Sequence, residues 1–158
     1  MHSLVVYLTE IRPQHQLQPP IPSQMAVAAL GRPDVPEADR RDFYLYADEF
    51  PSFTTSAFAG MLAEMRKYRL CLTLAHQHLG QLDEAVRGAV LGNGGTTIAF
   101  RIGMRDAEFL GKEFLPEFGS ADLIHLPNYH LYIRLMVNGT VSRPFSAKTM
   151  LPTSVEAA

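Results

Sequence analysis

Strand-like and helix-like segments alternate through the middle of this 158-residue chain, and this alternation constrains its fold more than any other feature. Apolar runs typical of buried strands occur at 43–50, 70–75 and 96–101, and helical patterns follow them at about 54–68, up to about 91, and near 104–115. Such an order requires crossover connections. We therefore predict an α/β fold with a mainly parallel sheet and helices on both of its faces.

The N-terminal part departs from this alternation. Residues 10–24 are rich in Pro, Gln and His, and repeated proline is incompatible with a regular helix or an interior strand. We predict an irregular segment over 1–24 and then a short helix over 24–30, with Ser23 as its N-cap.

The C-terminal part predicts a β-hairpin. Two strand-like runs, 129–137 and 140–145, flank Asn138-Gly139, a dipeptide that favours a tight primed turn. We therefore expect one main domain over 25–149, which ends in this hairpin, and a tail over 150–158.

Composition limits the class of protein. With 47% hydrophobic and 19% charged residues, the chain can form one globular domain with a proper core. A net charge of −2 gives no global basic field, so contact with nucleic acid must come from a local patch or an assembly. The single cysteine, Cys71, excludes a disulfide within the chain, and Leu4–Leu8 is too short to span a membrane. We expect a soluble, cytoplasmic protein.

Two adjacent carboxylates end the first apolar run. Asp48 and Glu49 directly follow Phe43–Ala47, and residues just beyond a buried parallel strand lie at the edge where open α/β sheets bind ligands. Nucleotide-hydrolysing motors use such a pair to hold Mg²⁺ and to orient the attacking water. The structural alternative is a solvated loop start, with Glu49 facing water.

Two further features flank the second predicted strand. Gln77 follows that strand closely, where an amide can hydrogen-bond a terminal phosphate. Arg66 precedes it, in the cationic run 66–69 at the end of a helix. In that place Arg66 either interacts favourably with the helix dipole or reaches a neighbouring subunit's phosphates as an arginine finger.

Other kinds of site have less support in the sequence. His76 and His78 flank Gln77, but no cysteine or nearby carboxylate completes a metal site at ligand spacing. No G-x-x-x-x-G-K-[S/T] loop is present to cradle phosphates, and no G-x-S-x-G elbow indicates a serine hydrolase.

Taken together, these features resemble the C-terminal half of the P-loop ATPase core of HerA/FtsK-like DNA pumps, especially the TraD/TraG-type conjugative coupling proteins of type IV secretion systems. The resemblance covers roughly residues 25–149. It is carried by the order and spacing of four stretches: 40–53, 62–68, 72–82 and 93–101. It implies a partial RecA-like layered fold.

The resemblance also implies a role for each candidate residue. Asp48 would be the Walker B ligand of Mg²⁺, and Glu49 would polarise the attacking water. Gln77 would sense the γ-phosphate of ATP, and Arg66 would be the finger that acts on the neighbouring subunit. The implied cofactors are ATP and Mg²⁺. The implied partners are DNA, further copies in a hexameric ring and secretion-system components, which could hold the protein at the inner face of the cytoplasmic membrane.

The chain departs from this family because the Walker A strand and its loop are absent. In this fold type the missing strand lies inside the sheet, between the strand before Gln77 and later strands, so two interior edges would remain unpaired. Leu4–Leu8 is one candidate for the slot. A separate polypeptide that bears the N-terminal half is another. The family's membrane-spanning helices are missing as well.

Three functions remain open at this point. The first is half of an ATP-driven DNA-translocating motor that supplies the Walker B pair, the sensor and the finger and is inactive alone. The second is a non-catalytic interaction module, or the remnant of a truncated coupling protein. The third, a metal-dependent nuclease using Asp48 and Glu49, needs further carboxylates nearby, whereas Asp106 and Glu108 belong to a different segment.

Overall fold

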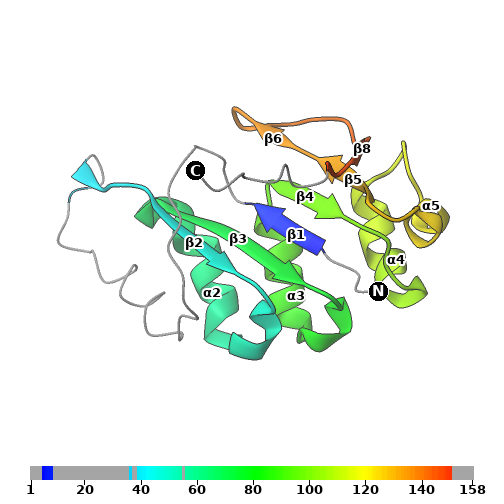
Figure 1. The fold of residues 1–158 in the computed structure, drawn as a ribbon. Coiled ribbons are helices and arrows are strands. Elements are labelled where there is room, and N and C mark those ends of the chain that lie inside the picture. Colours follow the sequence, from blue (N-terminus) through cyan, green and yellow to red (C-terminus); the bar gives the residue numbers. More distant parts are fainter. Residues whose placement is uncertain (1–4, 9–35, 37–38, 55, 151–158) are drawn as a thin grey trace, which may run out of the picture.

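The computed structural model describes residues 5–8, 36, 39–54 and 56–150. Its strands are β1 (Val5–Leu8), β2 (Phe43–Ala47), β3 (Leu70–His76), β4 (Thr96–Ala99), β5 (His130–Arg134), β6 (Met136–Val137), β7 (Thr140–Val141) and β8 (Phe145–Lys148). Six of them form one sheet in the order β2-β3-β1-β4-β5-β8, and β6 pairs with β7 separately (Figure 1). The protein is thus a mixed α/β fold.

Helices connect these strands. The α-helices are α2 (Ser56–Glu64), α3 (Glu84–Asn93), α4 (Met104–Leu110) and α5 (Ser120–His125). The 3-10 turns are η2 (Phe50–Phe53), η3 (Met65–Tyr68), η4 (Leu79–Gln81) and η5 (Gly111–Glu113). The helices predicted over 54–68 and near 104–115 are confirmed, each as an α-helix that a 3-10 turn continues. The predicted helix over 24–30 and residues 151–158 of the tail lie outside the described residues.

The sheet is mixed, so the prediction of a mainly parallel sheet is wrong. Among the described strands only β2 and β3 pair in parallel, and the other four pairings that the structure describes in this sheet are antiparallel. The predicted direction of the crossover strands is nevertheless correct: β1 runs against both β3 and β4, so β2, β3 and β4 all point the same way. The antiparallel pairings come from β1 and from the C-terminal strands.

The N-terminal strand β1 occupies the position between β3 and β4 for which Leu4–Leu8 was the candidate. Val5–Leu8 lies between β3 and β4, with Val5 opposite His76 and Ala99. Within 1–24, which was predicted to be irregular, the described residues are therefore a strand. Because β1 pairs on both sides, the interior edges of β3 and β4 are closed along its length.

One hydrophobic core lies between the sheet and the helices. Leu70, Leu72 and Leu74 alternate along β3 and are all buried, as expected for one face of a pleated strand. In Figure 1, α2 and α3 lie along one side of β2 and β3. Tyr132, which is in register with Ala99 on the same face, stacks against Phe118. In the described part of the chain the helices therefore cover one face of the sheet, and helices on both faces are not observed there.

The predicted β-hairpin is confirmed at its turn. Asn138 and Gly139, which join β6 to β7, have φ angles of +50° and +76°. Two positive φ angles are typical of the tight turn whose twist matches that of the flanking strands. Beyond the hairpin, β8 returns to pair with β5 at the edge of the main sheet.

Candidate functional site

Three of the four predicted site residues meet at one edge of the sheet. Because β2 and β3 are parallel and adjacent, with Ala47 opposite Leu74, both strands end at the same edge. Glu49 follows β2 and Gln77 follows β3 directly. The Gln77 Nε2 amide donates a hydrogen bond to Glu49 Oε1, across 28 residues of sequence. We call Asp48, Glu49 and Gln77 the carboxylate–amide cluster.

The turn after β2 places the two carboxylates differently. Glu49 adopts a left-handed conformation, with φ 50° and ψ 39°, which costs a residue with a side chain about 1–2 kcal/mol. Its backbone N–H donates to Asp48 Oδ1 at 2.9 Å. Asp48 is exposed and Glu49 is half-buried. The turn thus presents Asp48 to solvent and directs Glu49 toward Gln77.

Aromatic packing behind the cluster holds this turn in place. The Phe50 side chain is 2% exposed, and its ring meets the His76 ring edge-on, with centroids 5.2 Å apart. On another side Phe50 stacks on Phe58 of α2, with centroids 6.2 Å apart. Since Phe50 follows Glu49 and His76 precedes Gln77, a buried ring pair lies beneath the hydrogen bond that joins the two strands.

His76 is fully buried, and burial lowers its pKa below the usual 6.5, against the opposing attraction of Asp106 and Glu49. A base whose pKa is lower in the folded state binds fewer protons than in the unfolded chain. The stability that the neutral ring contributes is therefore complete above about pH 6.5 and is lost as the pH falls toward the folded pKa.

We expect His76→Phe to lose less stability than the parent between pH 7.5 and 5.5, measured by urea unfolding. Equal losses would contradict this.

A buried carboxylate on α4 lies next to the loop that follows β3. The Asp106 Oδ2 atom is 3.7 Å from His78 Nδ1, and the side chain of Asp106 is only 10% exposed. His78 directly follows Gln77, so this contact connects the cluster to the helix layer. From the sequence, Asp106 was assigned no role because it belongs to a different segment from Asp48 and Glu49.

Arg66 lies at the opposite end of the sheet. It belongs to η3, which leads into the start of β3, whereas Gln77 follows its end. A strand of seven residues spans about 20 Å. Arg40 fixes this turn by donating from Nη1 to the Lys67 carbonyl at 2.7 Å. Arg66 therefore does not join the cluster of its own chain, and its side chain lies outside the described part of the structure.

Three of the four α-helices in the described residues carry an acid at or near the N-terminus, where phosphates can bind, whereas α2 has none in its first turn. The Asp83 carboxylate caps α3 by accepting from the Val86 N–H at 2.8 Å, and Asp106 lies in the first turn of α4. In α5, Asp122 accepts from the Gly119 N–H at 2.7 Å. A phosphate would meet negative charge at each of these three ends, and at α3 and α5 the acid already accepts from a backbone N–H.

The cluster suits Mg²⁺ only in part. Magnesium is commonly held by one or two carboxylates together with phosphate oxygens and water, which an exposed Asp48 permits. Among the described residues no group of three or more His, Cys, Asp or Glu side chains could hold a metal ion by itself. Asp48 could thus contribute one ligand to a Mg²⁺ ion whose other ligands are not protein side chains of this cluster.

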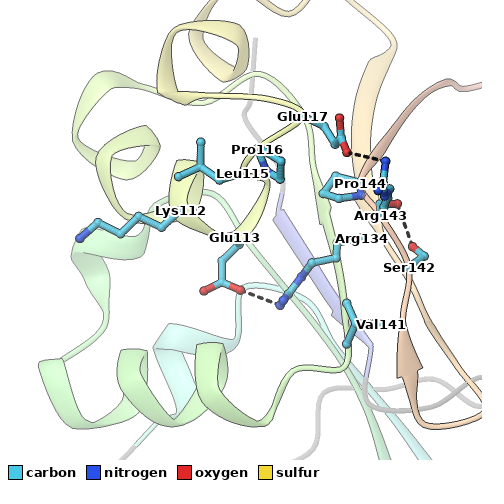
Figure 2. A pocket seen from close by; sticks show the side chains of 10 residues that line it. All are labelled: Lys112, Glu113, Leu115, Pro116, Glu117, Arg134, Val141, Ser142, Arg143 and Pro144. Atoms are coloured by element: carbon cyan, nitrogen blue, oxygen red, sulfur yellow. Dashed lines mark hydrogen bonds and ion pairs between the residues drawn. The ribbon is translucent and has the colours of Figure 1, made fainter.

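A separate cavity of about 580 Å³ lies between η5 and the C-terminal strands (Figure 2). Figure 2 shows Arg134 of β5 reaching toward Glu113, with Nη2 2.6 Å from Oε2. On the same wall, Arg143 Nη1 is 3.8 Å from Glu117 Oε1. Each of these guanidinium groups thus has a carboxylate beside it that offsets its charge.

Comparisons with known proteins add no relative. The chain matches no protein-family model, and neither curated proteins nor solved structures gave a match.

None of the helices within the described ranges is long and apolar enough to cross a membrane.

Proposed function

We propose that this chain is the C-terminal half of an ATP-driven DNA-translocating motor of the conjugative coupling-protein type. In this proposal it supplies the Walker B carboxylates Asp48 and Glu49, the sensor Gln77 and the finger Arg66. It lacks the loop that holds the phosphates and is inactive alone. The observation that carries the proposal is the Gln77–Glu49 hydrogen bond, beside Asp48, at the edge where two parallel strands end.

The chemistry of the cluster agrees with this proposal. A carboxylate that accepts from an amide can respond when a γ-phosphate competes for that amide, because the same Gln77 N–H groups would donate to either oxygen. Displacement of Gln77 would free Glu49 to polarise water, while Asp48 remains exposed for Mg²⁺. Arg66 belongs to η3, at the other end of β3 and about 20 Å from the cluster, so in this proposal it acts on a neighbouring subunit and not on its own cluster.

The test is nucleotide binding and hydrolysis by the full chain, alone and mixed with the product of the reading frame directly upstream, where that frame encodes a phosphate loop. For the chain alone we expect phosphate release at the buffer rate and weak MgATP binding by calorimetry, because a backbone cradle and its lysine supply most of the charge neutralisation. Mixing is expected to raise MgATP affinity at least about tenfold, a change of about 1.4 kcal/mol.

Two variants separate binding from chemistry in that mixture. Glu49→Gln is expected to lower turnover by about 100-fold or more while the gain in affinity persists, because it removes the group that activates water. Asp48→Asn should reduce the dependence of nucleotide binding on Mg²⁺. Glu49-dependent turnover by the chain alone would contradict the proposed division of labour.

The second candidate function is a non-catalytic interaction module. The acids at the N-termini of α3, α4 and α5 favour it, because they make these three helix ends poor sites for a phosphate. If mixing changes neither MgATP affinity nor turnover, this candidate replaces the motor.

A further inference from the structure

The loop between α5 and β5 holds an aromatic side chain in a backbone conformation that folding disfavours. Tyr129 has a φ angle of +67°, and its side chain is 63% exposed. A positive φ angle is uncommon for a residue with a large side chain, whereas glycine and asparagine adopt it readily. A smaller residue would therefore make this turn at a lower cost, and a ring that is mostly exposed adds little to the hydrophobic core.

Several hydrogen bonds hold this loop in place. The Tyr129 carbonyl accepts from the backbone N–H of Thr149 at 2.8 Å and from the Thr149 hydroxyl at 3.3 Å. The side-chain oxygen of Asn128 accepts from Arg101 Nη2 at 3.1 Å, and the Asn128 carbonyl lies 3.0 Å from His130 Nδ1. Disfavoured backbone conformations that their surroundings fix in this way are concentrated at ligand-binding sites. The loop thus keeps an exposed aromatic ring at a fixed position.

Positive charge lies on both sides of Tyr129. In the sheet β5 lies between β4 and β8, and both neighbours run antiparallel to it, so that their ends lie beside its start. Tyr129 directly precedes β5, Arg101 follows the end of β4, and Lys148 ends β8. Arg101 and Lys148 are exposed, and Lys148 forms no ion pair with any residue that the structure describes. Two strand spacings, roughly 10 Å, separate the strands β4 and β8.

We infer that Tyr129, Arg101 and Lys148 form a binding site for single-stranded nucleic acid, in which a base stacks on the tyrosine ring and the flanking phosphates meet the two cations. Aromatic rings beside positive charge bind single strands in this way without reading their sequence. Cations on both sides of the ring fit a continuing strand, which has a phosphate on each side of a base, better than a free nucleotide. That the strand is DNA moved by a motor rests on the proposed function, whereas the binding site does not.

Fluorescence anisotropy of a labelled thymidine oligonucleotide, about twelve nucleotides long, measures binding by the full chain at low salt and without ATP. The variant Tyr129→Asn removes the ring, and asparagine tolerates the left-handed backbone. We expect it to bind the oligonucleotide about tenfold more weakly than the parent, while its midpoint of urea unfolding stays the same or rises. Tyr129→Phe keeps the ring and should bind like the parent. An abasic oligomer of equal length should bind the parent about tenfold more weakly as well, because it keeps the phosphates and lacks the bases.

Two matched controls separate this site from the rest of the surface. Tyr46 on β2 is 57% exposed, so Tyr46→Thr removes a similarly exposed ring and should leave the affinity unchanged. Lys148→Gln should reduce the slope of log affinity against log salt by about 0.7, the value for one phosphate contact on a single strand. Lys112→Gln, at an exposed position beside the cavity in Figure 2, should leave this slope unchanged.

The inference is overturned if the parent does not bind the oligonucleotide, if it binds the abasic oligomer equally well, or if Tyr129→Asn binds like the parent. Because ATP is absent from these measurements, they are independent of the test of the motor. Binding through Tyr129 together with unchanged MgATP affinity in the mixture described above would refute the motor and leave this site standing. A gain in MgATP affinity without oligonucleotide binding would have the opposite meaning.

Discussion

Replacing Phe50 by alanine is expected to lower the free energy of unfolding by about 3–5 kcal/mol, the cost typical of removing a buried aromatic ring. The Phe50 side chain is 2% exposed and packs against both His76 and Phe58. The cavity left by the ring would lie directly beneath the turn that carries Glu49. Urea unfolding followed by circular dichroism measures the loss.

A matched control for this prediction is Phe109→Ala. Phe109 is 42% exposed, and its ring lies under the Arg87 guanidinium at 4.5 Å from the centroid. An exposed cation–π contact contributes about 0.5–1 kcal/mol. If the two substitutions cost the same, Phe50 is not the anchor of the site turn, and another explanation would be needed for how Glu49 is held.

The second large effect is expected at Gly111, where alanine should destabilise the protein by about 1–3 kcal/mol through overpacking. A Cβ atom there would lie 2.5 Å from Ser120 Oγ and 3.0 Å from the Ser120 backbone nitrogen. The Ser120 hydroxyl can rotate away from the added Cβ atom, but the contact with the Ser120 backbone nitrogen can be relieved only if η5 and α5 move apart. The shift in the midpoint of thermal unfolding measures this cost.

The same glycine-to-alanine substitution at Gly88 should stabilise the protein instead of destabilising it. Gly88 lies inside α3 and is exposed, and nothing lies within 4 Å of a Cβ atom built there. Because alanine is a better helix former, Gly88→Ala is expected to stabilise the protein by about 0.5–1 kcal/mol. A stabilising Gly111→Ala, or a destabilising Gly88→Ala, would show that the packing of this helix layer differs from the structure described above.

The part of the site that was predicted correctly depends on strand adjacency. Two apolar runs joined by one amphipathic helix indicate parallel neighbours, and parallel neighbours end at the same edge. This reasoning is sufficient to place Glu49 near Gln77, which the structure confirms. The chemical roles of the three residues, and of Arg66, stay predictions.

The wrong predictions concern segments whose sequence does not indicate strand polarity, or segments too short to show a periodic pattern. An apolar run of four residues such as Val5–Leu8 fits a strand of either polarity, so its antiparallel pairing could not be predicted. A six-residue helix such as α5 shows less than two turns of periodicity. Burial of His76 was predictable in principle, because it continues the alternation of Leu70, Leu72 and Leu74. From the sequence, His76 was instead weighed together with His78 as a possible metal ligand.

The left-handed backbone at Glu49 also limits which sequences this site can accept. Glycine adopts that conformation freely, and asparagine or aspartate do so at modest cost, whereas residues branched at Cβ are strongly disfavoured. In a saturation library at position 49, side-chain shape should therefore affect the survival of a variant in a selection for folding more strongly than side-chain charge does. Valine and isoleucine should be depleted for folding reasons, and uncharged asparagine and glycine should survive any selection that demands only a folded chain.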